Sequence, residues 1–223
     1  TLLAPYPKQV LDENGWQIET YDPWAPSKFM EEVPNRVHVT IAGRDVSIKA
    51  WKYEIRGIGG HVVPVYFLDT NENGNHDSDQ AITGSNPLYS ADSYYRLCQE
   101  AVLGIGGVKM LQSLGHDVEK YHMNEGHSAL LTLELQRQLG DREKVREVTA
   151  FTTHTPVPAA RDYFSYELAR EVLGDALPNN IGELAGKNDL SMTHLALNMS
   201  GYINAVSKKH GEVTRAMFPG YEI

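Results

Sequence analysis

The spacing of hydrophobic and polar positions divides the chain into two parts. Residues 36–41 (RVHVTI) and 46–55 (VSIKAWKYEI) alternate polar and apolar positions on either side of the turn AGRD, which predicts an antiparallel hairpin. The stretch 61–69 (HVVPVYFLD) is more continuously apolar, as a buried strand would be, although Pro64 favours an edge or a bulge. Residues 1–35 show no clear period, and we expect irregular structure there.

The second part alternates between strand and helix signals. After a polar loop at 70–92, an apolar helical pattern of about twenty residues begins near Ser93. The signals that follow are strand 117–123, helix 125–139, strand 146–153, helix 163–173, helix 191–199, strand 201–207 and helix 208–217. Such alternation with short connections predicts βαβ units and a mostly parallel sheet. We therefore expect an α/β sheet region over 61–223, preceded by an irregular segment and the hairpin over 1–60.

Composition narrows the class of protein. The chain has 223 residues, 41% of them hydrophobic, and its net charge of −9 without a basic run argues against nucleic-acid binding. No apolar run approaches the ~20 residues that span a bilayer, so we expect no membrane segment. The single cysteine, Cys98, excludes a disulfide framework, is interpreted as a buried thiol and favours a cytoplasmic location. The start at Thr1 and the abrupt end suggest a piece of a longer protein.

Two glycine-containing segments imitate ligand-binding loops. DTNENGNHDSDQ (69–80) fills five positions of an EF-hand, but its twelfth position is Gln80 instead of a bidentate glutamate, and a strand precedes it. We therefore expect no calcium site. GIGGV (104–108) lacks the G-x-G-x-x-G spacing and lies inside a helical pattern, so we interpret its glycines as points of close helix packing.

Polar side chains follow two consecutive predicted strands. The first group is Asn124, Glu125 and His127, and the second is Thr153, His154, Thr155 and Asp162. In a parallel sheet both loops open at the carboxyl edge, where ligands of such folds bind. These groups suit a ligand dense in hydroxyls, although helix capping explains them about as well. His122 and His127 lack the spacing of a zinc-binding pair, so we predict no metal site.

Several longer segments resemble one enzyme family. YHMNEGHSALLTLEL, AFTTHTPVPAARDYF and MTHLALNMSGYINAVSKKHGEVTRAMFPG are similar to segments of the bacterial and archaeal α-glucan phosphorylases, relatives of glycogen and maltodextrin phosphorylase. DENGWQIETYDPW, VPVYFLDTN and YYRLCQEAVLGIGGVKML resemble the same family in the same order. The resemblance extends from about Leu11 to Gly220.

The resemblance implies part of the N-terminal domain of a GT-B-type enzyme with two Rossmann-like domains and a cleft between them. Such an enzyme cleaves terminal α-1,4-glucosyl units of a glucan or maltodextrin with inorganic phosphate and releases glucose 1-phosphate. Its pyridoxal 5′-phosphate is held by a lysine of the C-terminal domain, which the resemblance places beyond Ile223. We therefore expect this segment to bind no cofactor, to be inactive alone and to self-associate through an unpaired sheet edge.

The resemblance also assigns roles to residues. His154 matches the catalytic-site histidine that hydrogen-bonds the glucosyl unit at the cleaved position, partly through its backbone carbonyl. Glu125 and His127 match groups lining the sugar site, and Asp162 matches an acid at its edge. Asn124, Thr153 and Thr155 complete the predicted substrate-binding set. Ala160 and Arg161 depart from the Gly-His pair that many relatives have.

Two alternatives stay open. A non-catalytic carbohydrate-binding or interaction module would bind maltodextrin without turnover. A sugar-nucleotide transferase of the same fold is weaker, because nothing in the sequence indicates a nucleotide site.

Overall fold

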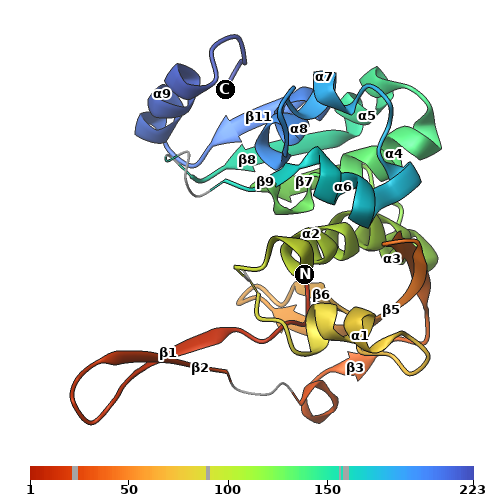
Figure 1. Cartoon of the computed structure of the whole chain (residues 1–223), viewed down its shortest axis with the longest axis vertical. Coiled ribbons are helices and arrows are strands. Elements are labelled where there is room, and N and C mark those ends of the chain that lie inside the picture. The colour runs from red at the N-terminus through yellow and green to blue at the C-terminus, as the bar shows by residue number, and fades with distance from the viewer. Residues whose placement is uncertain (22–24, 89–90, 156, 158–160) are drawn as a thin grey trace.

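Two sheets of different kinds are joined by a central helical segment in the computed structural model of the chain (Figure 1). The structure describes residues 1–21, 25–88, 91–155, 157 and 161–223. The antiparallel sheet contains β3 (Glu31–Glu32), β4 (Val37–Ile41), β5 (Arg44–Arg56) and β6 (Val62–Asp69). The parallel sheet has the order β11 (Tyr202–Ala205), β8 (Thr149–Thr153), β7 (Tyr121–Asn124). The fold is therefore mixed α/β, with parallel pairing among three strands of its second half.

The predicted hairpin is confirmed, but the strand after it belongs to the same sheet. β4 pairs antiparallel with β5, and Val37, Val39 and Ile41 turn one side of β4 into the core while the residues between them stay exposed. β6 also pairs antiparallel with β5, although the sequence pattern had grouped residues 61–69 with the mostly parallel α/β region. The physical reason is the short connection: a tight turn at 57–61 can join only antiparallel neighbours. The expected division between residues 60 and 61 falls in this turn.

The N-terminal segment is more regular than its pattern predicted. β1 (Pro7–Leu11) and β2 (Gln17–Tyr21) form an antiparallel ribbon that projects from the body (Figure 1). Asp12 builds its turn by accepting hydrogen bonds from the backbone N–H groups of Asn14 and Trp16. Most side chains of the ribbon are exposed on both faces, which is why no hydrophobic period marks it.

The second half contains the predicted helices and several shorter elements that the pattern missed. The predicted helices are α4 (Leu131–Leu139), α6 (Tyr166–Leu173), α8 (Met192–Met199) and α9 (Lys208–Met217). The missed elements are α1 (Asp77–Gly84) within the expected loop, α5 (Arg142–Val148), α7 (Ile181–Ala185) and the pair β9 (Tyr163–Ser165) and β10 (Asp189–Ser191). Local capping starts α1 and α5: His76 accepts from Ser78 N–H, and Asp141 accepts from Glu143 N–H. Because α5 extends to Val148, the strand predicted from residue 146 begins at Thr149.

The central helical segment packs on both halves of the molecule. It consists of α2 (Ser93–Ala101), a π-helical turn, η2 (Val102–Gly106), and α3 (Gly107–Ser113). A Cβ on Gly104 would lie 2.7 Å from the Leu131 backbone nitrogen, and one on Gly106 would lie 2.7 Å from Ile48 Cδ1. The interpretation of these glycines as close-packing points is confirmed. Gly104 lets the start of α4, and the corner before it, lie directly against the central segment.

The core runs through both sheets and the central segment. Ile48 in β5, Leu97 in α2, and Met123 and Phe151 in the parallel sheet are all fully buried. Cys98 is buried too, and burial raises the pKa of its thiol to about 12, which confirms the interpretation of a structural cysteine. Among the helices of the described residues, none has the length and apolar character needed to cross a bilayer.

Candidate functional site

The two loops that carry the predicted site residues leave the parallel sheet side by side. β7 and β8 are adjacent and parallel, with Asn124 opposite Thr152. Just beyond β7, Glu125 N–H donates to the Thr152 carbonyl oxygen at 2.9 Å. The 3-10 turn η3 (Gly126–Ser128) follows, with His127 in it. The expected placement of the 119–127 and 151–162 loops at one carboxyl edge is confirmed for their described residues.

The Glu125 side chain joins the first loop to the second. Its Oε1 accepts hydrogen bonds from Thr155 N–H at 2.6 Å, from Thr153 Oγ1 at 3.2 Å, and from His154 N–H. The residue is buried, with 8% of its surface exposed. A carboxylate that accepts two consecutive backbone N–H groups fixes the direction in which that loop leaves the strand.

A second junction lies at the far end of the second loop. His127 Nδ1 is 3.1 Å from Asp162 Oδ2, and Arg96 Nη2 of α2 reaches both atoms, at 2.9 Å and 3.0 Å. The loop that starts at Thr153 is therefore tied to the first loop at both ends. Its middle, including Ala160, lies outside the described residues.

Glu100 lies one helical turn from Arg96 and is buried behind this cluster. Arg96 Nε is 3.2 Å from Glu100 Oε1. Burial raises the pKa of Glu100 well above its ordinary value, and the nearby Asp162 carboxylate adds to this, against the opposing effect of Arg96. Burial also acts to raise the pKa of Asp162, but the contacts with His127 and Arg96 outweigh it and lower that pKa. The two pKa shifts have opposite directions, one favouring the protonated form of Glu100 and the other the ionised form of Asp162, on either side of one guanidinium.

The cluster has the residue types of a metal site, but a guanidinium already occupies its centre. Glu100, His127 and Asp162 offer ligand atoms that all lie within 4.8 Å of one another. Arg96 Nη2 lies within 3.0 Å of two of these atoms. A metal ion would have to displace this cation from the position where the ligands converge.

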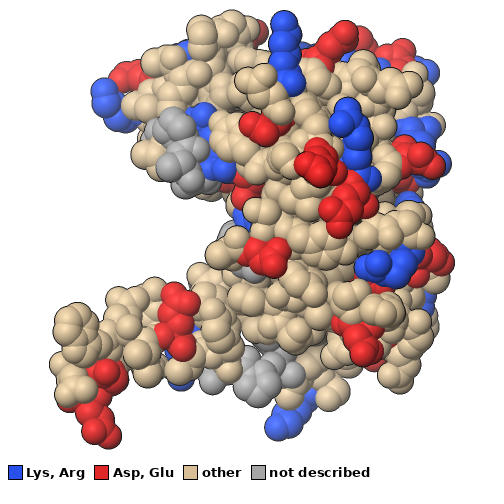
Figure 2. Space-filling model, viewed as in Figure 1, with Lys and Arg blue, Asp and Glu red and all other residues tan. Residues whose placement is uncertain are grey.

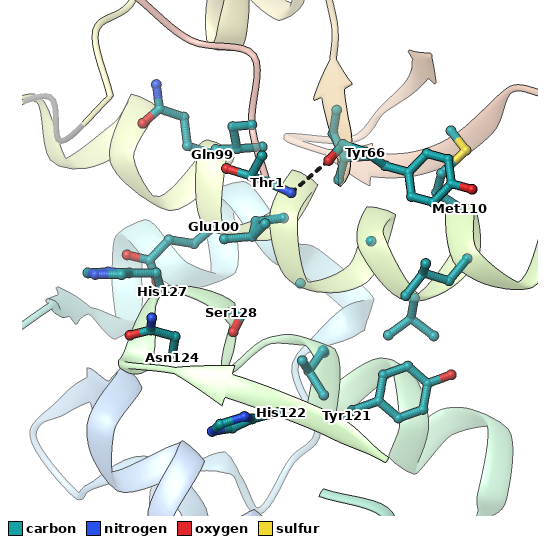
Figure 3. Close-up of a pocket in the computed structure, with 18 of the residues that line it drawn as sticks. Thr1, Tyr66, Gln99, Glu100, Met110, Tyr121, His122, Asn124, His127 and Ser128 are labelled. Carbon is teal, nitrogen blue, oxygen red and sulfur yellow. Dashed lines mark hydrogen bonds between the residues drawn. The ribbon is translucent and has the colours of Figure 1, made fainter. Parts of the chain in front are cut away.

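A cavity of about 670 Å³ opens beside the cluster (Figure 3). Asn124, His127 and Glu100 gather at one end of it, while Tyr66, Met110 and Tyr121 lie at the other. The predicted site overlaps the cavity only partly. Of the seven predicted residues, Asn124 and His127 line it, whereas Thr153, His154, Thr155 and Asp162 stand outside, as does Glu125. The His154 side chain is exposed at the edge of the sheet.

Figure 2 shows how charge is distributed on one face of the molecule. Acidic and basic side chains are interspersed over the body, and the surface is hollowed between the body and the projecting β1–β2 ribbon (Figure 2). The described residues of this face form no continuous basic surface of the kind that binds phosphate backbones.

The sequence of the chain is similar to segments of known proteins. No family model matches the chain. It is 35% identical to the maltodextrin phosphorylase of Thermococcus litoralis, over 96% of this chain and 27% of that protein. It is 33% identical to the glycogen phosphorylase of Mycobacterium tuberculosis, over 96% of this chain and 28% of that protein. The chain is homologous to a segment of the maltodextrin and glycogen phosphorylases.

The homology covers most of this chain and a minor part of its relatives. The chain spans about a quarter to a third of the length of the phosphorylases it matches, from 27% to 34%. It is also 36% identical to an uncharacterised protein of Methanocaldococcus jannaschii, of which it covers 36%. The phosphorylases are therefore about three to four times as long as the segment that this chain matches.

Arg96 and Glu100 are the residues that sequence reasoning missed in this phosphorylase-related segment. Both lie in YYRLCQEAV, the segment that also contains Cys98. Their side chains are 11% and 3% exposed. A signal was present: charged residues four apart within an otherwise apolar helix are seldom buried unless they pair with each other or with a site.

Proposed function

We propose that this chain is part of the N-terminal, Rossmann-like domain of a GT-B-type α-glucan phosphorylase and supplies part of its glucosyl-binding site. The whole enzyme cleaves terminal α-1,4-glucosyl units of a glucan or maltodextrin with inorganic phosphate and releases glucose 1-phosphate. The observation that carries the proposal is the match to phosphorylases over 96% of the chain. The junctions between the two carboxyl-edge loops support it, because they assemble polar groups in one place.

The chemistry of the site suits a neutral, hydroxyl-rich ligand. Asn124, Thr155 and the imidazoles of His127 and His154 can each donate to or accept from a sugar hydroxyl. Arg96 and Asp162 hold Nδ1 of His127 and so fix the orientation of its ring. His154 is proposed to contact the glucosyl unit at the cleaved position, partly through its carbonyl oxygen. Thr153 and Asp162 are proposed to shape the same pocket.

The residues of this chain do not fit pyridoxal 5′-phosphate. Among the described residues, Lys120 is the one lysine that lines the cavity, and the Glu147 carbonyl oxygen binds its ammonium group at the start of β7, away from Asn124. We therefore assign the cofactor and its lysine to the C-terminal domain of the parent enzyme. In the family the cofactor phosphate supplies acid/base chemistry. The chain alone is proposed to be inactive.

The test is phosphorolysis by the parent enzyme and by this chain. The full-length protein is expected to release glucose 1-phosphate from maltopentaose and phosphate and to show a pyridoxal absorbance band. The chain by itself is expected to show neither. A His154→Ala variant of the full-length protein is expected to lose at least about a hundredfold in kcat/KM. Full-length protein without phosphorolysis would refute the proposal, and activity in the isolated chain would refute the assignment of the cofactor lysine to another domain.

We also propose a cytoplasmic location, which the single buried thiol fits, and self-association of the isolated chain. Leu11 and Trp16 of the β1–β2 ribbon are each 72% exposed, and such side chains recruit partners. Light scattering is expected to report a mass above the 24.9 kDa of one chain. A monodisperse 24.9 kDa species over a wide concentration range would show self-association to be wrong.

A further inference from the structure

Glu125 combines an unusual backbone conformation with an unusual set of side-chain hydrogen bonds, neither of which the sequence pattern predicts. Its backbone has φ 62° and ψ −176°, a region populated almost only by glycine. Its Oε1 meanwhile accepts from two consecutive backbone N–H groups and one hydroxyl of the neighbouring loop. A strained backbone conformation persists only where the surrounding structure enforces it. The strain at Glu125 and the hydrogen bonds that its side chain accepts therefore have a common structural cause.

The corner at Glu125 has no room to relax. A Cβ on the next residue, Gly126, would lie 3.0 Å from Met192 Cβ and 3.3 Å from Thr193 N, so the turn packs against the first residues of α8. On the other side, Glu125 N–H is bonded to the Thr152 carbonyl oxygen. The chain turns from β7 into η3 in the space between β8 and α8, and the positive φ lets Glu125 direct its carboxylate to the end of β8 and the loop after it.

The hydrogen bonds to Glu125 also decide where the neighbouring carbonyl groups point. The structure contains no cis peptide bond among its described residues, and in a trans peptide the N–H and the preceding C=O point in opposite directions. Because Thr155 N–H is directed at Glu125, the His154 carbonyl oxygen is directed away from Glu125. The same argument directs the Thr153 carbonyl oxygen away from the carboxylate that binds His154 N–H.

We infer that Glu125 is a positioning residue, which aims the backbone of His154 and Thr155 instead of contacting the ligand itself. Its consequence for sugar binding rests on the proposed function, in which the His154 carbonyl oxygen accepts a hydrogen bond from the glucosyl unit. The strained corner and the two N–H bonds are properties of this chain and stand apart from that function.

Amide hydrogen exchange measured by NMR on this chain tests the inference directly. Glu125→Ala removes the acceptor, and exchange of the His154 and Thr155 amides is expected to accelerate at least about tenfold. Glu125→Gln keeps an oxygen acceptor without the charge, so an acceleration of a few-fold is expected, between wild type and Ala. Asp79→Ala is the matched control, because it removes a buried carboxylate whose partner, Arg44, lies in the antiparallel half. It is expected to leave these two amides unchanged relative to the rest of the sheet.

The outcomes separate this inference from the proposed function. Rates at the two amides within about twofold of wild type in E125A and E125Q would overturn the positioning role, and so would an equal acceleration in Asp79→Ala. If E125A does not fold, the E125Q comparison decides alone. A maltopentaose titration of the full-length protein is the second readout. Full-length protein that binds no maltopentaose, while the amides of this chain respond as expected, would refute the sugar site and leave the positioning role standing.

Discussion

The antiparallel sheet and the carboxyl edge of the parallel sheet both bury carboxylates, but they use them differently. In the first, Asp69 accepts from Trp51 Nε1 and Thr83 Oγ1, both at 3.0 Å, and Asp79 pairs with Arg44 at 2.6 Å. At the carboxyl edge, Glu100 lines a cavity and has a raised pKa because it is buried. Buried carboxyl groups with strongly perturbed pKa values in a cavity are typical of functional sites.

The segment that resembles a ligand-binding motif has a structural role, whereas a segment without such a motif contributes to the candidate site. The EF-hand imitation at 69–80 begins with Asp69, whose carboxylate is already used by the Trp51 indole and the Thr83 hydroxyl. The segment around Arg96 and Glu100 matches no ligand-binding motif, yet the Arg96 side chain reaches His127 and Asp162. Complete local hydrogen bonding thus indicates a structural role, whereas charge collected beside a cavity indicates a site.

The largest effect on stability is expected from replacing the buried-carboxylate partner in each region, Arg96 at the carboxyl edge and Arg44 in the antiparallel half. Arg96→Met should lower the free energy of unfolding by about 3 kcal/mol, since it leaves buried carboxyl groups without their partner. Arg44→Met should cost somewhat less, because the Arg44 side chain is 38% exposed. Urea unfolding measures both. Only Arg96→Met should also weaken maltopentaose binding, by more than about tenfold, because His127 and Asp162 lose their shared donor. Equal losses of affinity in the two variants would abolish the distinction between the regions.

A smaller effect is expected at the contact that links the central helix to the site. Gly104→Ala should destabilise the chain by about 2 kcal/mol, because the new Cβ meets the Leu131 backbone, which cannot move aside. Gly182→Ala in α7 meets nothing within 4 Å and should be neutral or stabilising by about 0.5 kcal/mol. Thermal melts of both variants check this. A harmless Gly104→Ala would mean that the corner is not held by this contact.

Because of the strain at Glu125, glycine at this position should be more stable than alanine, the reverse of the usual order in a helix. Glu125→Gly should be more stable than Glu125→Ala by about 1 kcal/mol, because glycine adopts the positive φ without cost. At Glu143, an exposed position in α5, the order should reverse, with Ala more stable than Gly by about 1 kcal/mol. Denaturant unfolding of the four variants measures both differences. The same order at both positions would contradict the strain.

The smallest effect is a pH dependence with a defined sign. The raised pKa of Glu100 means that the native state keeps a proton that the unfolded chain loses above about pH 4.5, its ordinary pKa. Wild type should therefore lose stability relative to Glu100→Gln as the pH rises from about 4.5 towards the native pKa. Tm measured from pH 4 to 8 tests this.

Glu134→Gln is the control of opposite sign. Burial acts to raise the pKa of Glu134, but its hydrogen bonds to Arg137 and Gln138 outweigh this and lower the pKa. The stability that ionised Glu134 contributes is present above pH 4.5 and lost as the pH falls through its native pKa. A Glu100→Gln profile that follows the Glu134→Gln profile would show that Glu100 is ionised in the native state.

The local hydrophobic pattern was enough to predict those helices and strands that are long and bury one face. The 36–55 hairpin, the long central helix and the order of the longer helices and the parallel strands after residue 117 follow from alternation and amphipathic spacing. The placement of Asn124, Glu125, His127 and His154 at one edge of the sheet also followed from sequence, since they come directly after strands. In a parallel sheet such residues must meet at one edge.

Tertiary structure alone decided how these residues are used. The sequence places Glu125 among polar residues, but its direction depends on a positive φ imposed by packing against α8. Arg96, 31 residues before His127 in the chain, and Glu100 join the site from α2, because Gly104 allows the central segment to approach the corner. The sheet to which β6 belongs depends on the turn before it. The hydrophobic period of a segment indicates which face of its helix or strand is buried. The strand with which it pairs and the direction of its polar side chains depend on close packing between segments distant in sequence.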